Sequence, residues 1–474
     1  MIRTGDVYFD SEEFRNILST FEESFNSGHP AFIDADDLAD IADFYHINGY
    51  DDKASEVIEY ALSLYPNATQ PNVFKARQAL TDGDIDLAKE CIEQIESKDD
   101  PDYHYMQAEL LIAQDREDEA DAYLRDYFMT VPPEEYEDFI MDVANIYFAY
   151  ELSDKAYEWL MRSKGDNSNT FKELMGHALF GMGNYKECER IFTELLDEDP
   201  YSTHYWNALA NAQLMSKDYT GALTSCDFST AINPEDSDAL MTKANTLYQI
   251  GDYEESIRYF DRYAAINHSD ELCLLHKGSC LVNLNRHEEA IDVLQQALAL
   301  CDTDSPLLLQ IYQELALSYS ALQRKDEAIS CIDKATDLKC DLLEILILKG
   351  HVYLENDCID EAEKVFRNAI KRSQNDPLTI LRIIISLYEN RYVRAAYDLF
   401  QKYFSMFPTK NHKLAYSYMA LCCWDLGFTE DFLFYLRMAV ENNPQEARLV
   451  LGRLFPEELA AKDYYSYIYH KLKQ

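Results

Sequence analysis

The chain has 474 residues, of which 86 are acidic and 42 are basic, and its formal net charge is −44. This excess argues against nucleic acid and anionic membranes as partners, because both are bound through basic surfaces. The first 200 residues carry 47 acidic and 15 basic side chains, so that region forms either a solvated acidic surface or a docking face for a basic partner.

The N-terminal residues contain no apolar stretch behind basic residues, so we expect no signal peptide, and no run reaches transmembrane length. Residues 10–26 are predicted to form a helix that Asp10 caps and Gly28 ends, with Phe14 and Phe21 in its apolar stripe. We expect this helix to cover the exposed face of the first repeated unit, so residues 1–34 are predicted to be a cap.

Small residues recur along residues 35–444 at intervals of 32 to 38 residues. They are Ala54, Ala88, Ala120, Ala156, Cys188, Ala222, Ser256, Ala290, Ala328, Ala362 and Ala396, with Phe432 as the large exception. A second small residue lies twelve positions before each of these, except at Ile384. Two antiparallel helices approach closely only where the facing side chains are small, so the pattern predicts twelve helical hairpins. The residue four positions after each site is larger, except at Cys226, and a residue such as Phe366 is predicted to fill the space beside the crossing.

The turns inside the hairpins carry their own signal. A left-handed residue is expected there, at Gly49, Gly83, Gly183, Gly251 and Gly427, and at Asn285 and Asp357 in the same position.

The pattern resembles the tetratricopeptide repeat family, with its best local match at Trp206, Leu209, Ala210, Ala222 and Pro234. The resemblance implies an all-α fold, a right-handed superhelical solenoid of antiparallel helix pairs with about twelve repeats. It also implies a non-catalytic scaffold that binds a protein or peptide segment in the concave groove.

After the repeats, residues 446–455 and 457–471 are predicted to form two helices separated by Pro456. Residues 445–474 would then be a C-terminal cap. The second helix is rich in tyrosine, and exposed aromatic side chains favour contact, so weak self-association through it is the alternative to a cap.

A ligand of such an array would meet the residue that follows the first small residue of each repeat, which we call the groove position. The groove positions are Asp43, Arg77, Glu109, Asn145, His177, Asn211, Asn245, Ser279, Leu317, His351, Ile385 and Leu421. An asparagine amide both donates and accepts, so a ladder of them can pair with the backbone of an extended peptide. The candidate peptide-binding residues are Asn145, His177, Asn207, Asn211, Asn245 and Ser279.

Another interpretation of this ladder remains open. The asparagines could simply bond to adjacent helices or to water. Peptide-binding members of the family also use basic residues to clamp a terminal carboxylate, but Leu275 and Ser279 occupy those positions here, so we do not expect that function.

No catalytic motif, phosphate loop or calcium loop is found, so we expect neither an enzyme nor a cofactor. The histidines are dispersed without ligand spacing, and His104, His204 and His276 are expected to pack or face solvent rather than to bind metal. The eleven cysteines lack paired spacing, which suits a reducing, cytoplasmic location.

The alternative function is a regulatory sensor whose superhelix changes shape on binding a small peptide.

Overall fold

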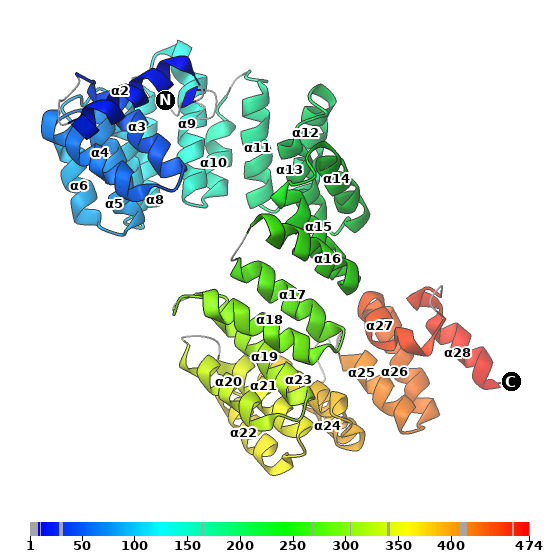
Figure 1. Ribbon diagram of the computed structural model, residues 1–474. Helices are drawn as coiled ribbons and strands as arrows, with labels where there is room; N and C mark the ends of the chain where they lie inside the picture. Colours follow the sequence, from blue (N-terminus) through cyan, green and yellow to red (C-terminus); the bar gives the residue numbers. More distant parts are fainter. Residues whose placement is uncertain are drawn as a thin grey trace. The chain divides into compact units, whose positions relative to one another are not determined.

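The computed structural model describes residues 8–9, 11–27, 32–163, 165–267, 270–303, 305–338, 342–407, 415–456 and 459–473. These residues contain 27 α-helices and no strand, so the predicted all-α fold is confirmed. The chain divides into two compact units, Met1–Asn233 (unit 1) and Pro234–Gln474 (unit 2). Within each unit the helices follow one another as antiparallel pairs (Figure 1).

Unit 1 begins with a single helix, and six pairs follow it. Its helices are α2 (Glu12–Ser27), α3 (Ala35–Ile47), α4 (Asp51–Leu64), α5 (Thr69–Thr81), α6 (Ile85–Gln94), α7 (Pro101–Ile112), α8 (Glu117–Phe128), α9 (Tyr136–Ala149), α10 (Ser153–Leu160), α11 (Asn169–Gly181), α12 (Tyr185–Glu198), α13 (Thr203–Met215) and α14 (Tyr219–Ile232).

Unit 2 contains six further pairs and two terminal helices. Its helices are α15 (Ser237–Ile250), α16 (Tyr253–Ile266), α17 (Glu271–Asn283), α18 (His287–Leu300), α19 (Leu308–Ala321), α20 (Lys325–Asp337), α21 (Leu342–Glu355), α22 (Ile359–Arg372), α23 (Pro377–Glu389), α24 (Val393–Met406), α25 (Ala415–Asp425), α26 (Thr429–Asn442), α27 (Pro444–Leu451) and α28 (Tyr464–Lys473).

The small residues lie where the helices of a pair cross, as predicted. Ala244 and Ser256 are fully buried, and the hydroxyl of Ser256 donates to the carbonyl of Ala244 at 2.8 Å. The close approach of the two helices also explains why some pairs have glycine as their first small residue. A Cβ added to Gly350 would lie 2.1 Å from Cε1 of Phe366, the bulky residue predicted to fill the space beside the crossing.

We therefore expect Gly350→Ala to destabilise unit 2, because a methyl group would overpack a closed hairpin at a cost of about 1–3 kcal/mol. Alanine normally stabilises a helix by about 1 kcal/mol relative to glycine, so the net loss should be up to about 2 kcal/mol. Urea unfolding, with hydrogen exchange in α21 and α22, would measure the loss. The second change Phe366→Leu should recover part of it, whereas simply additive losses would contradict the proposed clash.

The turn inside every hairpin holds one left-handed residue, always five positions before the second small residue. Its φ lies between 56° and 85° at all twelve positions. Seven are the residues predicted from glycine, asparagine and aspartate. The other five are Asp115, Glu151, Lys217, Gln323 and Arg391. Four of them have side chains that do not favour this conformation, so the sequence does not mark them, whereas Asp115 is of a type that tolerates it and was overlooked.

The two ends depart from the prediction in detail. Helix α2 starts at Glu12, after Ser11, whose hydroxyl accepts the backbone N–H of Phe14 at 3.1 Å; the expected caps Asp10 and Gly28 lie outside the described residues. The last helix, α28, starts at Tyr464, so the prediction of a helix from residue 457 was wrong.

Helix α28 packs on α26, and Tyr464 is buried with its ring stacked on Phe455 at 3.9 Å between centroids. The large exceptions at the crossings are also accommodated inside the core. Phe432 is fully buried against Trp424, and Ile384 is buried as well.

No helix among the residues that the structure describes combines the length and the apolar character needed to cross a membrane. No disulfide joins the ten cysteines in this part of the chain, and eight of these cysteines are buried.

Candidate functional site

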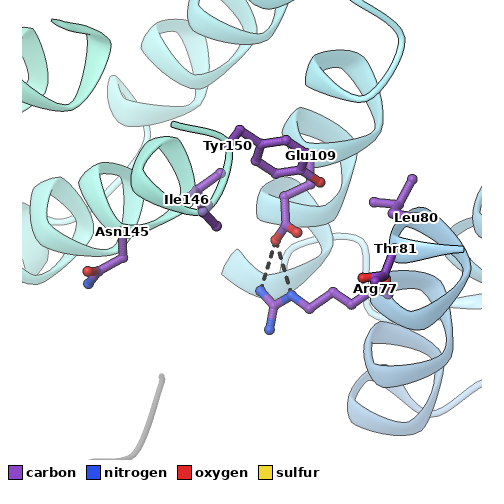
Figure 2. A pocket seen from close by; sticks show the side chains of 8 residues that line it. Arg77, Leu80, Thr81, Glu109, Asn145, Ile146 and Tyr150 are labelled. Atoms are coloured by element: carbon purple, nitrogen blue, oxygen red, sulfur yellow. Dashed lines mark hydrogen bonds and ion pairs between the residues drawn. The ribbon is translucent and has the colours of Figure 1, made fainter. Parts of the chain in front are cut away.

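Three consecutive groove positions of unit 1 meet in one pocket of about 390 Å³. They are Arg77 on α5, Glu109 on α7 and Asn145 on α9, each on the first helix of its pair and directly after a buried alanine. Figure 2 shows these side chains on three neighbouring helices. The other lining residues are Leu80, Thr81, Ile146, Ala149 and Tyr150.

An ion pair joins two of these helices. Nε and Nη2 of Arg77 donate to Oε1 of Glu109 at 3.2 and 2.9 Å (Figure 2). The Glu109 side chain is only 9% exposed, and that of Arg77 is 42% exposed. Burial acts to lower the pKa of Arg77, but the charge and hydrogen bonds of Glu109 prevail and raise it. Arg77 is therefore charged, and it is the only basic residue that lines the pocket.

The rest of the pocket combines an amide and a hydroxyl with aliphatic side chains and one phenol. Asn145 is half-buried, and its amide can both donate and accept. Burial, together with the charge of Glu109, raises the pKa of Tyr150, so its phenol stays neutral and can donate. The neighbouring groove position in the first repeat is Asp43, whose pKa is raised to about 6 by desolvation and by Asp40. The pocket thus suits a ligand with hydrogen-bonding groups.

The next groove positions of unit 1 differ in how much surface they offer. His177 on α11 is half-buried, and its Nε2 lies 3.9 Å from Oε1 of Glu173. Burial, and then the charge of His204, lowers the pKa of His177. On α13, Asn207 is buried with 8% exposure, and Asn211 is half-buried. Asn211 and His177 therefore present more surface to a ligand than Asn207.

In unit 2, Asn245 on α15 is half-buried. Ser279 on α17 is only 2% exposed, and its hydroxyl donates to Oε1 of Glu314 on α19 at 3.0 Å. Burial raises the pKa of Glu314. Ser279 thus orients a carboxyl group on the next repeat, a contact between positions 35 residues apart that single-residue reasoning did not anticipate.

Sequence reasoning placed Arg77 and Glu109 at groove positions but left them out of the candidate set, because it selected uncharged residues. It also missed a group formed by Glu173, His177 and His204, which could hold a metal ion among the residues the structure describes. His204 lies 27 residues after His177. This separation is shorter than one repeat by about two helical turns, so the two residues share a face of neighbouring first helices. Reading the sequence in the register of the repeat would have placed both on the same face.

Comparisons with known proteins agree with the repeat architecture. Family models described as tetratricopeptide repeats match residues 270–341 and 343–376. A model described as subunit 3 of the anaphase-promoting complex, or cyclosome, matches residues 198–297. No curated protein matches the chain.

Several solved structures are similar to this chain. MamA from Desulfovibrio magneticus is 20% identical, and the match covers 37% of this chain and 97% of MamA, with a TM-score of 0.34. A tetratricopeptide repeat protein from Parabacteroides merdae is 16% identical over 54% of this chain and 99% of its own, with a TM-score of 0.42. The match to the APC/C heterotetramer Cut9–Hcn1 is 14% identical and covers 88% and 98%, with a TM-score of 0.39. All three scores are below 0.5, so none of them bears on the site.

Proposed function

Because the chain is a tetratricopeptide-repeat protein, we propose that it is a protein-interaction scaffold whose concave groove holds an extended segment of another protein. The observation that carries this proposal is the pocket of unit 1, where three successive groove positions, Arg77, Glu109 and Asn145, lie together. Such a surface can contact an extended polypeptide that runs along the repeats, because each repeat offers one groove position to the next part of that polypeptide.

In this proposal the amide of Asn145 pairs with the backbone of the segment. The Arg77–Glu109 ion pair holds α5 and α7 in register. The excess of acidic residues in unit 1 favours a segment with basic side chains, through attraction that salt would weaken. His177 and Asn211 extend the same surface, and the buried Asn207 supports it.

Unit 2 would contribute its own contacts. Asn245 is half-buried and available for backbone pairing, whereas Ser279 acts by positioning Glu314. Each lost hydrogen bond to a ligand costs about 1 kcal/mol. The double variant Asn145→Ala/Asn211→Ala in unit 1 should therefore weaken binding measurably, and so should the single variant Asn245→Ala in unit 2.

Site-specific photo-crosslinking in native lysate would test the proposal. A photoreactive residue at Asn145 should give a discrete covalent adduct with a partner, which mass spectrometry then identifies. The matched control is the same residue at Gln94, an exposed amide on α6, the second helix of its pair. An adduct that forms equally from both positions and disappears in high salt would instead indicate binding to the acidic surface.

A further inference from the structure

Three potential metal ligands lie together on the first helices of two consecutive pairs in unit 1. Glu173 and His177 are one turn apart on α11, and His204 is in the first turn of α13. Nε2 of His204 lies 2.9 Å from Oε1 of Glu173, and Nε2 of His177 lies 3.9 Å from the same oxygen. One ligand atom from each residue lies within 4.8 Å of the other two.

These separations are close to those that a bound ion requires. Zinc binds imidazole nitrogen and carboxylate oxygen at about 2.0–2.2 Å, so two ligand atoms of a tetrahedral site are about 3.4 Å apart. The two distances to the Glu173 oxygen lie on either side of this value. The side chain of His204 is 59% exposed, so a small rotation can bring its nitrogen into place without disturbing the core. We propose that Glu173, His177 and His204 form a site for a divalent transition-metal ion such as Zn²⁺.

The chemistry of the three residues fits this ion. Zinc is bound by imidazole nitrogen and carboxylate oxygen, which are the groups that His177, His204 and Glu173 carry. Two imidazoles and one carboxylate favour zinc, cobalt, nickel or copper over magnesium and calcium, which prefer oxygen ligands.

Neighbouring side chains hold the ligands in place. Tyr205 hydrogen-bonds to the carboxylate of Glu173, and the ring of Phe192 contacts that of His177 with centroids 5.5 Å apart. Such outer contacts orient the ligands of protein metal sites. The side chains of Glu173, His177 and His204 are 30%, 39% and 59% exposed, so a fourth position is open to water. The ion would tie α11 to α13 and thereby join two neighbouring repeats.

Metal binding by the full-length chain would test this inference directly. Zn²⁺ is titrated in competition with a chromophoric chelator, and Co²⁺ is followed by its visible absorption. We expect one tight site per chain, with affinity reduced at least 10-fold in His177→Ala and in His204→Ala. His470→Ala, which removes an exposed histidine on α28, should leave the affinity unchanged.

A second measurement separates metal binding from folding. Circular dichroism without metal should show that His204→Ala is folded, since its side chain is mostly exposed. Zn²⁺ should then raise the thermal midpoint of the wild type but not that of His177→Ala/His204→Ala, because an ion that binds only the folded state stabilises it. Equal stoichiometry and affinity in the wild type and this double variant would place the ion on other groups and overturn the inference.

Discussion

Replacing Asp121 with alanine is expected to lower the stability of unit 1 by about 2–4 kcal/mol, because a buried charge-assisted hydrogen bond would be lost. The residue is 2% exposed on α8, and its Oδ1 accepts the indole N–H of the fully buried Trp159 at 2.9 Å. Its other oxygen accepts from Arg125 one turn later. Alanine would leave the indole N–H of Trp159 buried without its acceptor.

Asp118, one turn earlier on the same helix, provides a matched control. It also forms an ion pair, with Lys155 at 3.0 Å, but its side chain is 97% exposed. Exposed pairs contribute little, so Asp118→Ala should cost less than about 1 kcal/mol. Urea unfolding, with hydrogen exchange resolved over α8 to α10, compares the two. Similar losses in both variants would contradict the role assigned to the buried contact with Trp159.

The second large effect concerns pH and the C-terminal end of unit 2. Glu446 is in the first turn of α27, where Ser417 of α25 donates to its Oε2. Burial raises its pKa from the ordinary 4.5 to about 7, although the bond from Ser417 acts in the opposite direction. The folded chain therefore holds this proton more tightly than the unfolded chain. Stability should fall as the pH rises from about 4.5 to about 7 and change little beyond that interval.

Glu446→Gln removes this titration and keeps a neutral acceptor for Ser417. At pH 7.5 the variant should be more stable than the wild type by about 1–2 kcal/mol, a value reduced from the full shift because the side chain is partly exposed. At pH 4.5 the two should be nearly equal. Urea unfolding at several pH values, with hydrogen exchange in α25 to α28, measures this difference.

Glu441→Gln is the control for Glu446→Gln, since Glu441 is 54% exposed and pairs with Arg437 at the surface. It should leave the pH profile of unit 2 unchanged. A wild-type slope that persists in Glu446→Gln would assign the pH dependence to another group.

The fold could be predicted from the sequence because closely packed helices require small residues at their crossing points. A pair such as Ala244 and Ser256 must be small wherever backbones approach, whatever the surface residues are. The ends were predicted less well. The pattern predicted a helix over residues 457–471, but α28 starts only at Tyr464, whose ring stacks on Phe455, and residues 461–463 form a 3₁₀ helix that also packs on α26. Tertiary contacts, which no local pattern contains, decided that boundary.

The candidate site was predictable in position but only partly in chemistry. Counting along the repeat located Arg77, Glu109 and Asn145 on one face, yet it could not show that the first two form an ion pair. It also could not show that Ser279 is buried and bonded to Glu314. These contacts depend on side-chain directions across neighbouring repeats, and a list of positions does not contain them.

Five of the left-handed turn residues were not predicted from the sequence, and they have a practical consequence for protein engineering. Each of them holds a strained backbone that glycine would adopt without a Cβ penalty. Substituting glycine at Glu151 or Gln323 should therefore recover roughly 0.5–1 kcal/mol at each turn, after the entropy cost of glycine is subtracted. Because repeats contact only their neighbours, such gains from distant turns should add, giving a more heat-resistant chain whose binding surface is untouched.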